Sequence, residues 1–222
     1  MLKINILVEG PTEQLFVNRV LQPAFPKIIW SAQIIQTTPP INGQPARKGG
    51  TASYHTWRTM IRRLLNDSSA TAVTTMFDFD IHALPKDLPG RQDLPQGALY
   101  KRVAHLEKAL ADDINHRRFV PYFSVHDFEA LIFTDPAQVT KWKPDISPAT
   151  IAQLQQMRDG YESPEHINGD DPPSRRVTRL IEGYAKPQAG TLITSAIGLP
   201  TLRQHCSHFD NWLNILSDLP PT

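Results

Sequence analysis

The chain has 222 residues, 40% of them apolar, and a formal net charge of +1. This length and composition suit one domain with an appendage, and they exclude a disordered tail or a small disulfide scaffold. The near-neutral charge excludes a global basic field, so nucleic-acid binding would need locally placed basic residues or metal ions. A soluble enzyme acting on a small substrate would have a similar composition.

Cysteine usage and hydropathy bear on the compartment. Cys206 is the only cysteine, so no intrachain disulfide and no Cys-based zinc site can form, which suits a reducing cytoplasm. The apolar run near the N-terminus is short and broken by Asn5, unlike a signal peptide. No stretch approaches the roughly 18 apolar residues of a membrane span. We therefore expect a cytoplasmic protein that does not enter a membrane.

Alternating strands and helices fill the first 130 residues. Four short apolar segments predict buried strands, at residues 4–8, 28–36, 72–77 and 119–125. Between them, three amphipathic segments predict helices, after Gly10-Pro11 and at residues 54–64 and 99–114. Thr12 is a candidate cap for the first helix. This order predicts an α/β fold, with a mostly parallel four-stranded sheet flanked by helices and joined by right-handed crossovers.

The remaining residues predict helices only. Ser147-Pro148 has the cap and first-turn proline of a helix start. Further helices are predicted at residues 174–181, 191–197 and 209–216. We expect a core of residues 1–135 and a helical C-terminal extension of residues 136–222 packed on that core. The extension could form a channel wall, a homo-oligomer surface or a partner-binding face.

Acidic residues follow three of the four predicted strands. They are Glu9 and Glu13 after the first strand, Asp78 and Asp80 after the third, and Asp127 and Glu129 after the fourth. Because the site of a parallel α/β sheet forms at the carboxyl ends of its strands, we expect these carboxylates to converge. Asp78 and Asp80 should also share a face, because side chains alternate along an extended segment.

A cluster of carboxylates is stable only when cations balance it, since like charges raise each other's pKa. Oxygen ligands without cysteine favour Mg²⁺ or Mn²⁺ over zinc. Two such ions about 4 Å apart can stabilise the attacking and leaving oxygens of a phosphoryl displacement. The acidic residues therefore predict metal-dependent phosphoryl chemistry.

Two segments resemble the motifs of Toprim domains. Leu-Val-Glu-Gly-Pro-Thr-Glu at residues 7–13 resembles their glutamate motif, and Met-Phe-Asp-Phe-Asp at residues 76–80 resembles their Asp-x-Asp motif. Toprim domains occur in topoisomerases, primases, recombination-mediator proteins and overcoming-lysogenization-defect (OLD) nucleases. Nearly the whole chain is similar to a bacterial family of small Toprim-like proteins, the domain of unknown function 4276. The further matching segments are residues 125–133, 173–176 and 183–186, whereas residues 81–85 match nothing in that family.

The resemblance implies a metal-dependent nuclease, often encoded beside an ABC-type or OLD-like ATPase in anti-phage systems. By motif position, Glu9 is implied to be a metal ligand or general acid/base, and Asp78 and Asp80 to be metal ligands. Glu13 matches a second glutamate of OLD-type nucleases. Weaker local matches imply that Glu129 is a later acidic ligand and that Lys186 is a catalytic basic residue near the phosphate.

Several acidic-site candidates also have ordinary structural explanations. Glu13 could simply complement a helix dipole, and Asp127 could cap a helix that carries Glu129. His126, at a strand end, is either a hydrogen-bonded structural residue or part of the site.

The candidate phosphate-binding residues are equally open to a structural explanation. Arg47 and Lys48 lie in a Gly-rich loop and could contact phosphate or only solvate that loop. Arg175 and Arg176 follow Ser174, a candidate helix cap, and could bind phosphate or lie on an exposed first turn.

Two functions follow from these observations. The first is an endonuclease that cleaves DNA or RNA with Mg²⁺ or Mn²⁺ and works with a partner ATPase. The alternative is a non-catalytic subunit that binds metal or nucleotide and regulates that ATPase. A phospho-acceptor domain would need an acid pair at the very end of the first strand, where Glu9 is the only acidic residue. Topoisomerase chemistry would need a tyrosine on a large second domain, for which the chain has no room.

Overall fold

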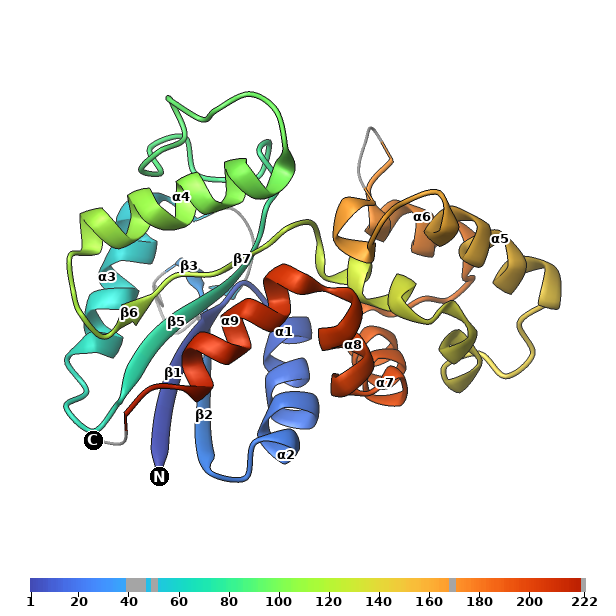
Figure 1. Ribbon diagram of the computed structural model, residues 1–222, viewed down its shortest axis with the longest axis horizontal. Coiled ribbons are helices and arrows are strands. Elements are labelled where there is room, and N and C mark those ends of the chain that lie inside the picture. The colour runs from blue at the N-terminus through green and yellow to red at the C-terminus, as the bar shows by residue number, and fades with distance from the viewer. Residues whose placement is uncertain (39–46, 49–51, 168–170, 221–222) are drawn as a thin grey trace.

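A parallel sheet forms the centre of the computed structural model, which describes residues 1–38, 47–48, 52–167 and 171–220. The strand order is β2-β1-β5-β6, and β7 also pairs with β5 (Figure 1). All pairs within this sheet are parallel. The strands are β1 (Leu2–Val8), β2 (Ile28–Ile34), β5 (Ala72–Asp78), β6 (Phe119–Val120) and β7 (Phe123–Ser124). The predicted α/β fold class is confirmed.

The predicted fourth strand is divided in two, which gives the sheet five strands rather than four. The interruption lies at Pro121, which has no N–H to contribute to a ladder. Beside it, the hydroxyl of Thr75 accepts a hydrogen bond from Tyr122 N (2.8 Å) and lies 2.9 Å from Tyr122 O. The Thr75 side chain thus takes over pairing at the point where β6 ends and β7 begins. The predicted second strand also ends early, and β3 (Gln36–Thr38) pairs antiparallel with β4 (Arg47–Lys48).

Helices cover both faces of the sheet, and the buried side chains form two clusters. α3 (Tyr54–Leu65) and α4 (Leu99–Ile114), at the predicted positions, pack on the face that carries Leu7, Val73 and Phe77. The opposite face carries Ile4 and Ile6 and is covered by α1 (Pro11–Phe16) and α9 (Ser207–Ser217), while α7 (Lys186–Ile197) packs on α1 (Figure 1). β1 and β5 are buried on both faces, as expected for central strands of a parallel sheet.

The first helix begins earlier than the sequence predicts. Gly10 is its N-cap and Pro11 its first residue, so the prediction that Thr12 caps it is wrong. Proline suits this position because the first helical N–H groups have no partner within the helix. The helical segment comprises α1 (Pro11–Phe16), a π-helical turn η1 (Val17–Leu21) and α2 (Gln22–Ala24).

Short helices make up the C-terminal region. They are η2 (Phe128–Thr134), η3 (Pro136–Lys141), α5 (Pro148–Asp159), η4 (Pro164–His166), α6 (Pro173–Leu180), α7 (Lys186–Ile197), α8 (Leu199–His205) and α9 (Ser207–Ser217). Ser147 caps α5 as predicted, accepting a hydrogen bond from Thr150 N. Ser174 does not cap α6, which begins one residue before it, and α7 begins at Lys186 rather than at residue 191.

The chain returns to the sheet at its C-terminus. Trp212 of α9 donates a hydrogen bond from Nε1 to Thr74 of β5 (2.9 Å) and stacks on Tyr122 with ring centroids 4.3 Å apart. One buried cluster accordingly joins residues from both sides of the predicted boundary near residue 135, and that boundary stays a prediction. Within the described residues, every helix is too short or too polar to cross a membrane.

Candidate functional site

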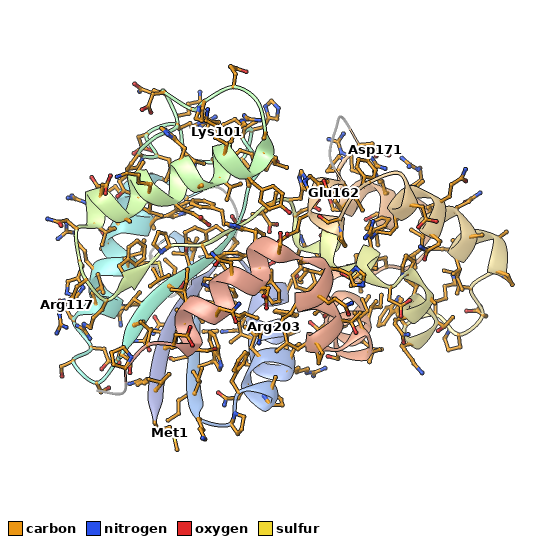
Figure 2. All side chains as sticks on the ribbon, in the orientation of Figure 1. Met1, Lys101, Arg117, Glu162, Asp171 and Arg203 are labelled. Atoms are coloured by element: carbon orange, nitrogen blue, oxygen red, sulfur yellow. The ribbon has the colours of Figure 1, made fainter. Side chains whose placement is uncertain are left out.

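A cavity of about 1000 Å³ opens where β1 and β5 end. Glu9, directly after β1, and Asp78, the last residue of β5, line it. One wall comprises residues 79–84 with the start of α4, and the other comprises His126, Asp127 and the start of α6. In Figure 2, the labelled Lys101 on α4 and Asp171 before α6 mark the two sides. The position agrees with the rule that placed the predicted site at the carboxyl ends of the strands.

Glu9 and Asp78 are joined across the two neighbouring strands. Glu9 Oε1 accepts a hydrogen bond from the backbone N of Asp78 at 3.1 Å. Burial, together with the nearby charge of Glu13, raises the pKa of Glu9 to about 7. Burial also raises the pKa of Asp78 well above its usual range, although Lys186 opposes that shift. Both carboxylates are therefore held where a negative charge is costly and a cation would be stabilising.

Asp80 lies on the surface side of the same cavity. Its carboxylate accepts a hydrogen bond from His82 N at 2.9 Å, and its carbonyl accepts from Ala83 N and Leu84 N. These bonds turn the chain immediately after β5. Asp78 and Asp80 both line the cavity, as the alternation of the two residues predicts, and Asp80 is the exposed member of the pair.

Glu129, which is buried, and Lys186 and Tyr184, which are partly buried, form a group beside Asp78. Lys186 Nζ lies 3.1 Å from Glu129 Oε2 and 3.9 Å from Asp78 Oδ2. Tyr184 Oη donates to Glu129 Oε1 at 3.1 Å, and Glu129 is only 1% exposed. Burial by itself lowers the pKa of Lys186, but the carboxylates of Asp78, Glu129 and Glu13 outweigh it and raise that pKa overall. Neither Glu129 nor Lys186 lines the cavity.

Glu13 has the structural role that its position allows. Its carboxylate accepts a hydrogen bond from Gly10 N at 2.9 Å, which completes a capping box at the start of α1. The side chain is buried and does not line the cavity. Its charge nonetheless acts on the site, because it raises the pKa of Glu9. A role as a metal ligand stays a prediction.

His126 and Asp127 line the opposite wall of the cavity. Asp127 precedes η2, but its carboxylate does not cap that helix; it accepts from Ser174 N at 3.0 Å and so fixes α6. Burial raises the pKa of Asp127 to about 6 and lowers that of His126 to about 4, which keeps the imidazole neutral near pH 7. Asp127 Oδ1 and His126 Nε2 are buried and have no hydrogen-bond partner in the described part of the chain.

The four predicted phosphate-binding residues are placed differently. Arg175 lines the cavity. Arg176 instead donates to Asp171 O (2.7 Å) and Tyr161 Oη (3.0 Å) and lies over the Tyr161 ring, so it braces the segment before α6. The backbones of Arg47 and Lys48 form β4, and their side chains lie outside the described residues.

Sequence reasoning did not identify two residues of this region. Tyr184 lies in the Gly-Tyr-Ala-Lys segment that resembles the family, so that segment could have indicated it. Arg102 is one of several charged residues beside the apolar stripe of α4, and nothing in the sequence distinguishes it. The structure places its guanidinium 5.2 Å from the centre of the Phe79 ring, and it lines the cavity.

The donor atoms of these acidic residues suit a divalent cation, whereas their present arrangement does not yet form a metal site. Among the described residues, no three His, Cys, Asp or Glu side chains are arranged to hold a metal ion as they stand. The donors, however, are carboxylate oxygens, which suit Mg²⁺ or Mn²⁺. Burial raises the pKa of Glu9 and of Asp78, so a bound cation would stabilise the charged forms of these two carboxylates. Glu9, Asp78 and Asp80 are the residues that would hold such an ion.

The fold and this cavity define an α/β protein with an acidic site at the carboxyl edge of a parallel sheet. A family model described as Domain of unknown function (DUF4276) matches residues 8–217, and the chain belongs to this family. The family resemblance found in the sequence is thereby confirmed.

Solved structures of OLD proteins are similar to the chain. The C-terminal region of the Burkholderia pseudomallei OLD protein is 14% identical, with a TM-score of 0.46 and 98% of each chain covered. The C-terminal region of the Xanthomonas campestris pv. campestris OLD protein is 16% identical, with a TM-score of 0.42, 96% of this chain and 95% of that chain being covered. No curated protein matches the sequence.

Proposed function

We propose that the chain is a Toprim-type nuclease that hydrolyses phosphodiester bonds of a nucleic acid with Mg²⁺ or Mn²⁺. One observation carries the proposal: Glu9, Asp78 and Asp80 leave two neighbouring parallel strands and line one cavity. These residues would bind the cation, and Glu9 could also act as general acid or base. When bound, the cation supplies charge neutralisation at the phosphate and activation of water.

The surrounding side chains would position the carboxylates and contact the substrate. Lys186 balances Asp78 and Glu129, and Tyr184 fixes Glu129 by a hydrogen bond. Glu129 would therefore influence Asp78 indirectly, through Lys186. Arg175, which lines the opposite wall, would contact a phosphate oxygen.

A partner is part of the proposal. The net charge of +1 provides little general attraction to nucleic acid. The family resemblance implies an ABC-type or OLD-like ATPase encoded nearby. We propose that such a partner contributes to nucleic-acid binding and that the two proteins act in an anti-phage system.

The test is cleavage of supercoiled plasmid in Mg²⁺, Mn²⁺ or EDTA, with and without the partner ATPase. We expect metal-dependent nicking that is lost in Asp78→Ala/Asp80→Ala. The matched control is Asp112→Ala/Asp145→Ala, which removes two exposed carboxylates outside the cavity. If folded Asp78→Ala/Asp80→Ala protein still nicks the plasmid, the proposal is wrong.

A second function is favoured by the position of Lys186. Its ammonium lies between Asp78 and Glu129, where it already balances part of the acidic charge. Such partial balance would also suit a non-catalytic subunit that binds metal or nucleotide and regulates an ATPase. Tight ATPase binding that changes ATP turnover, with no cleavage of any nucleic acid under any metal, would support this function.

A further inference from the structure

The cavity continues beyond the acidic residues into a wall of different chemistry. Phe79, Ile81, Leu84 and Leu99 line this part, and Arg102 lies over the Phe79 ring. We call these five residues the apolar wall. Because they share one cavity with Glu9 and Asp78, a ligand whose phosphate is at the acids would bring its next group against this wall.

We propose that the apolar wall binds an unpaired nucleobase adjacent to the phosphate at the acids, so that the substrate is a single-stranded nucleic acid. The inference rests on the proposed nuclease function and gives its substrate class. Aromatic rings and arginine guanidinium groups are the surfaces on which unpaired bases stack. Such stacking tolerates any base, since every base has a π-face.

The charge of the wall suits this occupant. Arg102 forms no ion pair with another described residue, and its guanidinium lies 5.2 Å from the centre of the Phe79 ring. It is half-buried, so a base stacked on it would be partly shielded from water. Arg175 lies on the facing wall, which gives the cavity positive side chains on both sides of an acidic floor. In a single-stranded nucleic acid, charged phosphates alternate with bases, and this order matches the order of charged and apolar surfaces in the cavity.

The wall is held in place before any ligand binds. Arg91 donates from its guanidinium to Ile81 O at 2.7 Å and also to Leu84 O. Gly90 packs against α4, where a Cβ would lie 2.7 Å from that of Ala109. A preorganised wall reduces the ordering cost of binding.

The size of the cavity argues against a duplex. Its volume of about 1000 Å³ is at the upper end of small-molecule sites. A cavity of that class holds about one or two nucleotides rather than a stacked double helix. A paired base would have to leave its duplex to reach the wall, at a cost of a few kcal/mol; an unpaired base has no such cost.

The experiment compares oligonucleotides that differ in one base. Single-stranded DNA and RNA, each intact or with one abasic residue, and the matching duplexes are tested for cleavage with the metal that supports nicking. We expect cleavage of intact single strands to exceed that of duplexes, and cleavage beside the abasic residue to fall roughly tenfold. DNA and RNA arms identify which sugar the site accepts.

The variant Arg102→Ala should remove the preference for the intact strand, whereas Lys101→Ala, the neighbouring exposed cation on α4, should keep it. Arg102→Lys keeps the charge but loses the planar group, and should resemble Arg102→Ala. Thermal denaturation establishes that each variant is folded.

Equal cleavage of intact and abasic strands, or preference for duplex, overturns the nucleobase site while the nuclease function stands. Absence of cleavage anywhere counts against the proposed function instead. Fluorescence anisotropy of the same oligonucleotides then still tests the wall, because equal binding of intact and abasic strands overturns it.

Discussion

Replacing Lys186 with methionine removes the ammonium that lies 3.1 Å from Glu129 and 3.9 Å from Asp78. Removing one partner of a buried ion pair costs roughly 3–5 kcal/mol. Because 39% of the Lys186 side chain is exposed, solvent screening reduces this cost, and we expect a loss of about 2 kcal/mol in the free energy of unfolding. For a chain of this length the Tm should fall by about 4–8 °C.

The loss should depend on pH in a defined direction. The pKa of Asp78 is already raised by burial, and Lys186 opposes that shift. Without Lys186 the pKa rises further, so the variant loses stability as pH rises through that value and recovers it when the carboxyl is protonated. The measurement is thermal denaturation by circular dichroism in EDTA, near neutral pH and under mildly acidic conditions.

Lys108→Met is the matched control. Lys108 Nζ lies 2.6 Å from Asp112 Oδ2, but these side chains are 76% and 65% exposed. Its replacement should change the free energy of unfolding by no more than about 0.5 kcal/mol. If Lys186→Met is as stable as Lys108→Met near neutral pH, the ammonium does not balance buried charge and the reasoning is wrong.

Two further variants test the packing and electrostatics of the site. In metal-free protein the folded pKa of Glu9 is raised to about 7, so the wild-type protein should lose on the order of 1–3 kcal/mol of stability as the pH rises from about 5 to above 7. Glu9→Gln should remove this loss. Urea denaturation at both pH values checks this, and an unchanged pH dependence would refute it. Gly190→Ala should destabilise the protein by about 1–3 kcal/mol, because its Cβ would lie 2.9 Å from Phe128 Cε1 and 3.1 Å from Tyr184 Oη. Gly160→Ala, whose nearest such contact is 3.5 Å, is the control in the same assay, and equal effects would contradict the packing explanation.

The location of the cavity could be predicted because it depends on strand order and direction alone. Once the strands are parallel, their carboxyl ends lie at one edge, so Glu9, Asp78, Asp80 and Asp127 meet there whatever their side-chain conformations. The strand boundaries were less predictable. Pro121 interrupts the fourth strand, and the side-chain hydroxyl that compensates comes from Thr75, distant in sequence.

The orientation of each side chain depends on partners that local sequence does not reveal. Glu129 follows a strand like the other acids, but Tyr184 and Lys186 hold it behind Asp78. Arg175 and Arg176 are adjacent in sequence, yet Arg176 is directed away by Asp171 and Tyr161. Apart from Asp171, these partners are distant in sequence, so no rule based on spacing could separate the residues that line the cavity from those that support it.

Four acids of the site therefore divide into an inner and an outer group. The inner group is Glu129 with Lys186 and Tyr184, in which the protein supplies its own cation and a hydrogen bond. The outer group is Glu9, Asp78 and Asp80, which face the cavity. Lys186 links the groups through its 3.9 Å approach to Asp78, so it partly neutralises the carboxylate that a divalent cation would also need. The affinity of the site for a metal ion should therefore depend on how strongly Glu129 binds Lys186. If that ion pair is weakened, Lys186 can neutralise Asp78 more fully, and Asp78 should become a poorer metal ligand.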